Sequence, residues 1–60
     1  MTLMEYIDSL SFEEKKGRKL HVYNLYNKPA FYPAFFFTEV KSAKITNKYI
    51  KIVVDTIYTK

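Results

Sequence analysis

The sequence predicts one small α+β domain over residues 1–60, with an N-terminal helix packed on a three-stranded antiparallel β-sheet in the order α-β-β-β. Three observations predict this fold. Residues 3–10 carry apolar side chains at helical spacing. The composition and alternation of residues 18–26 and 35–45 predict two extended segments. The third observation is the C-terminal stretch 49–59, the longest run of β-branched and aromatic residues without Gly or Pro.

The helix is predicted to begin at Leu3. Thr2 and Glu5 have the spacing of a capping box, in which each side chain bonds the other residue's backbone N–H. Leu3, Ile7 and Leu10 then form one apolar stripe. The sequence leaves open which face of the sheet this stripe covers.

A second helical turn is predicted over residues 12–16. Ser11 and Glu14 repeat the capping-box spacing, and Gly17 is a natural residue to follow the C-terminus of a helix. The two helical segments can also be read as a single kinked helix.

The first predicted strand covers residues 18–26. Leu20 and Val22 face one way, and His21 and Tyr23 face the other. Two prolines then mark residues 27–33 as a connection or a weak edge, because proline donates no ladder hydrogen bond.

The second and third strands are predicted to form a hairpin around Asn47-Lys48. A two-residue turn there pairs Ile45 with Ile50 and Ala43 with Ile52. Lys41 would then lie against the apolar Val54, so a β-bulge near residues 41–42 is expected to restore the phase.

The last strand is predicted to be central, because one of its faces is apolar and the other mixed. The apolar face carries Ile50, Ile52, Val54, Thr56 and Tyr58, and the mixed face carries Tyr49, Lys51, Val53, Asp55 and Ile57.

Composition argues against catalysis and against bound metals or cofactors. The chain has no Cys and a single His, so it lacks the residues for a thiolate or imidazole metal site. General acid–base catalysis needs titratable groups that converge in a cleft, and His21 has no acid or nucleophile near it in sequence. We therefore expect a non-enzymatic protein with no cofactor.

We expect a cytoplasmic protein without a membrane segment. The N-terminus lacks a basic region before its apolar residues, and no apolar run approaches the length that spans a bilayer. Nine Lys to one Arg, with abundant Ile, Tyr, Phe and Asn, is the usage of an AT-rich genome and fits a small phage protein.

Charge is unevenly distributed along the chain, whose net charge is +4. Residues 1–14 hold four acids and no base, whereas residues 15–60 hold all ten Lys and Arg against two acids. The basic part can attract phosphate or an acidic partner, or its lysines can simply solubilise an aromatic-rich sheet.

The first hypothesis for function is a protein-binding module, such as a phage-encoded inhibitor of a host protein that occludes a functional surface. If Phe35, Phe36 and Phe37 are consecutive in a strand, both of its faces carry a large ring, and one helix covers only one face. The exposed face would serve a partner protein or a second copy in a homodimer. The candidate interface residues are Phe35, Phe36, Phe37, Tyr23, Tyr26, Val53 and Ile57. The structural alternative is that Phe36 folds against the loop 27–33 and completes a small core.

The second hypothesis is nucleic-acid binding by a sheet surface that interleaves positive charge with aromatic rings. Its candidate residues are Arg18, Lys19, His21, Tyr23, Lys28 and Tyr32. The first strand is also predicted to be an edge, with fewer protecting lysines than the hairpin, and therefore a site for strand pairing between copies.

Overall fold

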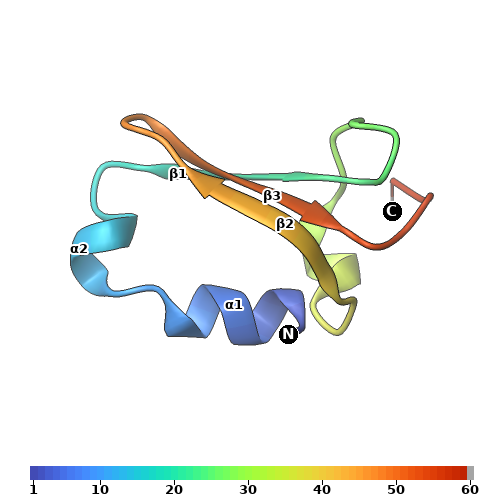
Figure 1. Ribbon diagram of the computed structural model, residues 1–60, viewed down its shortest axis with the longest axis horizontal. Helices are drawn as coiled ribbons and strands as arrows, with labels where there is room; N and C mark the ends of the chain where they lie inside the picture. Colours follow the sequence, from blue (N-terminus) through green and yellow to red (C-terminus); the bar gives the residue numbers. More distant parts are fainter. Residues whose placement is uncertain (60) are drawn as a thin grey trace.

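A computed structural model describes residues 1–59 of the chain and has an α+β fold, with helices packed against one three-stranded sheet (Figure 1). In chain order the elements are α1 (Leu3–Ser9), α2 (Phe12–Lys15), β1 (Lys19–Tyr23), the 3-10 helix η1 (Tyr32–Phe35), β2 (Val40–Ile45) and β3 (Tyr49–Val54).

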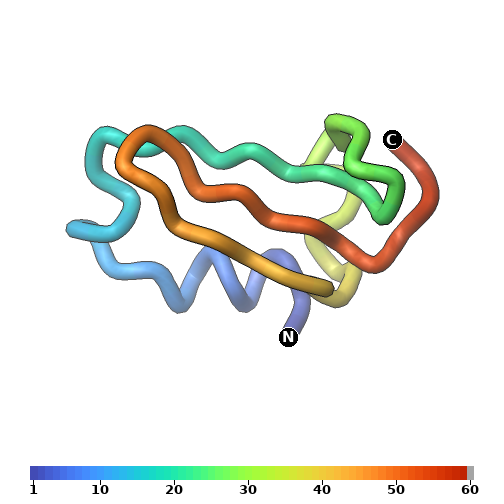
Figure 2. Tube along the Cα trace, turned by 45° about the horizontal axis from the view of Figure 1, so that its top comes forward, coloured from blue at the N-terminus to red at the C-terminus, as the bar shows by residue number. Residues whose placement is uncertain are grey.

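The sheet is mixed, and the prediction of a purely antiparallel sheet was wrong. The strand order is β1-β3-β2, with β2 antiparallel to β3 and β1 parallel to it. The connection between β1 and β2 leaves and returns at the same end of the sheet (Figures 1 and 2). β1 and β2 therefore run in opposite directions, and β3, which reverses β2 through a hairpin, runs parallel to β1.

The core lies between α1 and one face of this sheet, called the covered face. It consists of the buried residues Leu3, Leu10, Val22, Phe35, Ile50, Ile52 and Val54. The predicted apolar face of the central strand is confirmed at the three β3 residues of this set, and the helix covers that face. Thr56 and Tyr58 lie beyond the end of β3.

Both predicted capping boxes are present. The Thr2 hydroxyl accepts a hydrogen bond from the Glu5 N–H, and the Glu5 carboxylate accepts one from the Thr2 N–H. Ser11 and Glu14 make the same pair of hydrogen bonds at the start of α2. Two separate short helices result, and Gly17 follows the second with a φ of 72°, a conformation that glycine adopts without strain.

The β2–β3 hairpin has the predicted register. Ile45 pairs with Ile50 and Ala43 with Ile52, and a bulge between Val40 and Ser42 brings Val40 opposite Val54. The extra residue keeps the apolar positions of both strands on the covered face.

The prediction that Phe35, Phe36 and Phe37 lie in a strand was wrong. With Pro33 near its start, the chain forms the 3-10 helix η1 here, and β2 does not begin until Val40. Alternation between two faces does not apply in such a turn, so the three rings point in different directions.

Asn24 joins the segment after β1 to the segment after β3. Its side chain is buried, and its Oδ1 accepts hydrogen bonds from the N–H groups of Tyr26 and Lys28. Its Nδ2 donates to the carbonyl oxygen of Ile57 at 3.1 Å. β1 ends at Tyr23, so the predicted strand 18–26 was too long at this end, where the Asn24 side chain bonds the backbone instead.

Candidate functional site

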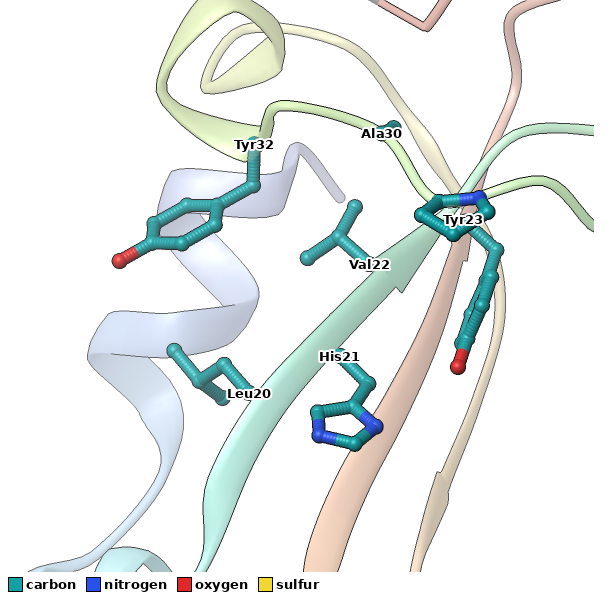
Figure 3. Close-up of a pocket in the computed structure, with 7 residues that line it drawn as sticks. Leu20, His21, Val22, Tyr23, Ala30 and Tyr32 are labelled. Atoms are coloured by element: carbon teal, nitrogen blue, oxygen red, sulfur yellow. The ribbon is translucent and has the colours of Figure 1, made fainter.

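Within residues 1–59, one face of the sheet has no layer packed over it; we call it the open face. Its strand residues alternate with the core positions and are Lys19, His21, Tyr23, Ser42, Lys44, Tyr49, Lys51 and Val53. Figure 3 shows Leu20 and Val22 on the side of β1 that faces α1. His21 and Tyr23 lie on the other side (Figure 3).

Three half-buried rings lie together on the open face. His21 stacks on Tyr49 with ring centroids 4.8 Å apart and an interplanar angle of 14°. Tyr23 approaches His21 edge-on at 6.5 Å. The ammonium group of Lys51 lies 5.2 Å from the centroid of the Tyr23 ring, within the range of a cation–π interaction.

The lysines of the open face have no ion-pair partner among residues 1–59, where the sole ion pair joins the Met1 amine to Glu39. Lys44 and Lys51 lie directly opposite each other on β2 and β3. Two like charges in such a pair destabilise a sheet. A bound anion would relieve this repulsion.

A shallow hollow of about 250 Å³ lies beside these two lysines. Ser42, Ala43 and Val53 complete its lining, which therefore combines apolar groups with two positive charges. The rings and the hollow thus form one continuous surface across all three strands.

The four acidic residues of the two N-terminal helices lie away from this surface, whereas Glu39 directly precedes β2 and Asp55 directly follows β3. Glu5 and Asp8 are on α1, beneath the covered face, and Glu13 and Glu14 are on α2 (Figure 1). No strand residue on the open face is acidic within the described part of the chain. The four acids of residues 1–14 therefore lie on the helical side of the molecule, and the strand lysines Lys19, Lys44 and Lys51 lie on the other side.

Two of these acids have structural roles as helix caps. The hydrogen bond from the Thr2 backbone N–H lowers the pKa of Glu5, and the one from Ser11 lowers the pKa of Glu14. Both carboxylates therefore remain ionised at neutral pH.

Three of the residues predicted for nucleic-acid binding, Lys19, His21 and Tyr23, lie together on the open face. The Arg18 guanidinium has a structural role, since its Nε donates to the Thr46 carbonyl at 2.7 Å and its Nη1 to the Glu14 carbonyl at 2.6 Å.

Lys28 lies in the loop after β1. Tyr32 lies on η1, outside the strands of the open face, but it lines a groove at the edge of β1 together with His21 and Tyr23. Sequence reasoning missed Tyr49, Lys51 and Lys44 as companions of the β1 residues. The alternation of the last strand already put Tyr49 and Lys51 on one face, but only the strand order brings them beside β1.

The residues predicted for a protein interface are dispersed. Phe35 is only 7% exposed and belongs to the core, so its prediction as an interface residue was wrong. Phe36 is partly buried and meets Tyr32 edge-on at 5.9 Å, as the structural alternative proposed. Phe37 is 81% exposed. Tyr23 and Val53 lie on the open face.

Tyr26 and Ile57 lie in a second surface, the aromatic end, where the segments after β1 and β3 run side by side (Figure 2). Leu25 N–H donates to the Thr56 carbonyl, and Phe31 N–H donates to the Thr59 carbonyl. The exposed apolar residues gathered by these contacts are Leu25, Tyr26, Phe31, Ile57 and Tyr58.

The outer edge of β1 is partly occupied by its own chain. Ala30 N–H donates to the Val22 carbonyl, and Asn24 N–H donates to the Lys28 carbonyl. A groove of about 330 Å³ between the edge and η1 is lined by β1 residues together with Ala30 and Tyr32 (Figure 3). The edge predicted to be open for strand pairing is thus free only along its first half.

Residues 1–59 contain no group of three or more His, Cys, Asp or Glu side chains that could hold a metal ion. No helix in this range has the length and apolar character needed to cross a membrane. Comparisons with protein-family models, curated proteins and solved structures found no significant match.

Proposed function

We propose that this protein is a small, non-enzymatic, cytoplasmic protein that binds nucleic acid on the open face of its sheet. The observation that carries the proposal is a lysine-bearing face whose strand residues include no acid, and on which Lys44 and Lys51 oppose each other. A polyanion supplies the negative charge that this face lacks.

The binding energy in this proposal comes mainly from phosphate contacts. Each lysine that neutralises a phosphate releases a condensed counterion, so affinity falls as salt rises. Lys19, Lys44 and Lys51 offer three such contacts, one from each strand. Binding through so few contacts is weak, with a dissociation constant on the order of 10⁻⁶ to 10⁻⁴ M at physiological salt.

The charge difference between the two sides of the molecule also determines which side a polyanion approaches. The acids of α1 and α2 repel a polyanion from the helical side, while the open face attracts it. Encounters are therefore steered to the open face at low ionic strength.

A salt titration of oligonucleotide binding tests the proposal. With three phosphate contacts, the logarithm of the binding constant should fall with the logarithm of salt concentration with a slope of about −2 for a single strand, and Lys44→Gln should reduce that slope by about 0.7. Lys15→Gln, on α2 away from the open face, is the matched control and should leave the slope unchanged. The absence of binding to any nucleic acid at low salt would refute the proposal.

A second candidate function, binding to another protein, is favoured by the aromatic end. Its five exposed apolar side chains come from two segments held together by backbone hydrogen bonds. Aromatic residues are enriched at protein interfaces. In this candidate, the protein is a phage-encoded modulator or inhibitor that covers a functional surface of a host protein, or forms a homodimer through the same surface.

The molar mass in solution tests the homodimer. A mass near 14 kDa, twice the 7.2 kDa of one chain, should return to the monomer value in Tyr26→Ser. Phe37→Ser, which is also exposed but lies outside the aromatic end, is the control. A monomer at high protein concentration argues against self-association and leaves a host protein as the partner to be sought by affinity capture.

A further inference from the structure

The centre of the open face is made of rings rather than of charge. Tyr23, His21 and Tyr49 lie next to one another, and Val53 lies beside Tyr23 as its cross-strand neighbour. Lysines surround this apolar centre, and Lys51 also lies over the Tyr23 ring. Phosphate contacts would use only the polar atoms of these side chains, the Tyr hydroxyls and the His21 ring nitrogens, and do not require that the ring faces lie together.

We infer that the open face binds unpaired strands, with bases stacked on the Tyr23, His21 and Tyr49 rings and phosphates on the surrounding lysines. This inference rests on the proposed function and names its ligand class. Every base has a π-face, so stacking on aromatic side chains holds a single strand with little regard to sequence.

The geometry of the stacked pair supports this ligand. His21 stacks on Tyr49 and has Tyr23 edge-on beside it, so the ring face that this pair leaves for a base is the second face of the partly exposed Tyr49. An unpaired base that stacks on this remaining face extends the pair to three layers. In a duplex the bases are stacked on each other, and their faces are not available to side chains.

The hollow adds a position for a second base. Val53, on the open face, gives it an apolar floor beside Lys44 and Lys51. A base that lies on this floor brings its phosphate toward the two lysines and so places a negative charge between the like charges.

Among residues 1–59, no helix is suited to the major groove of a duplex. An α-helix with basic residues commonly enters the major groove. Here α1 contains no basic residue, α2 has only four residues, and α1 lies on the side of the sheet opposite the open face (Figure 1). A sheet surface that carries rings suits a strand whose bases are splayed out.

The test compares three probes on the full chain: a short labelled oligothymidylate, a duplex of the same length, and inorganic polyphosphate, which has charge but no bases. Fluorescence anisotropy gives the dissociation constant for each nucleic acid, and competition gives that for polyphosphate. We expect the single strand to bind at least about fivefold more tightly than the other two, which corresponds to one stacked base.

Variants that lack one of the three rings test whether the preference for single strands arises on the open face. Tyr49→Val and Tyr23→Val each replace a ring with valine, a residue that also favours strands. Each variant should weaken single-strand binding by about fivefold or more and leave polyphosphate binding unchanged. Tyr49→Phe, which keeps the ring, should retain binding. Tyr26→Val, at the aromatic end, is the matched control. Far-UV circular dichroism verifies that each variant is folded.

The outcomes separate the two proposals. Equal affinity for single strand, duplex and polyphosphate overturns the inference about unpaired bases and leaves phosphate binding intact. Failure of all three probes to bind at low salt overturns the proposed function itself. Because the comparison of probes uses the unaltered chain, it decides the inference even if a ring variant does not fold.

Discussion

The two faces of β3 differ in what they contribute to the molecule. On the covered face, Ile50, Ile52 and Val54 are fully buried against α1 and η1. On the open face, Tyr49, Lys51 and Val53 remain partly accessible and lie beside β1 residues of similar character. One strand thus supplies the centre of the core and the centre of the candidate binding surface. Substitutions on the two faces should therefore separate stability from binding.

The largest expected effect is a difference in stability between variants of Phe35, which lies in η1, and Phe37, which lies in the turn after it. Phe35→Ala should lower the free energy of unfolding by about 3–5 kcal/mol, because it leaves a cavity under the covered face. Phe37→Ala should change it by about 0.5 kcal/mol or less, since that ring is exposed. Urea denaturation measures both, and equal losses would contradict the placement of the two rings.

Val54 and Val53 provide the same comparison within β3 itself. Val54→Ala removes two buried methyl groups and should cost about 2 kcal/mol, at about 0.8 kcal/mol for each group plus a cavity contribution. Val53→Ala, on the open face, should cost less than half as much. If Val53→Ala were the more destabilising of the two, the assignment of the faces would be wrong.

Substitution of Asn24 tests how much its hydrogen bonds stabilise the attachment of the aromatic end to the sheet. Asn24→Ala should cost about 1–3 kcal/mol, because the N–H groups of Tyr26 and Lys28 and the Ile57 carbonyl each lose a partner. Hydrogen exchange should accelerate at those two N–H groups, with β3 little affected. Asn47→Ala, in the exposed hairpin turn, is the matched control. Unchanged exchange at Tyr26 and Lys28 would argue against the role of Asn24.

The smallest expected effect is the acid sensitivity of the helices on the covered side. The pKa values of Glu5 and Glu14 lie below the ordinary value of 4.5 in the folded chain, because both carboxylates accept capping hydrogen bonds. Their contribution to stability is therefore complete above about pH 4.5 and is lost as the pH falls through the lowered values.

Circular dichroism between neutral pH and pH 2 measures this loss of helicity. The double variant Glu5→Gln, Glu14→Gln should show a weaker pH dependence, whereas Glu13→Gln should resemble the unaltered chain, because Glu13 makes no capping-box hydrogen bond. The same pH dependence in all three chains would contradict the capping assignment.

Sequence reasoning succeeded where the relevant contacts are local. The capping boxes join residues three apart, and the bulge at residues 41–42 follows from the spacing of apolar residues around one tight turn. It failed at Phe35, Phe36 and Phe37, where strand-forming composition was a poorer guide than the turn that contains Pro33. Propensity reports how well a residue suits a strand, and tertiary packing decides whether a strand forms there.

The candidate site was predicted only for its β1 part. Lys19, His21 and Tyr23 alternate within one strand, so the sequence alone groups them. Tyr49, Lys51 and Lys44 join them through strand pairing, which the sequence of each strand does not specify. Arg18 was assigned to the site by its charge, but its hydrogen bonds to backbone carbonyls give it a structural role.

The sequence by itself determined the helix starts, the hairpin register and the division of β3 into an apolar and a mixed face, because these depend on residues close together in the chain. Only the tertiary structure decided that β1 lies parallel to β3, that α1 covers the apolar face, and that the lysines and rings of three strands share the other face. The physical reason is that long-range pairing depends on the path of the connection between β1 and β2 and on which faces bury each other. Both depend on the whole chain rather than on any single segment.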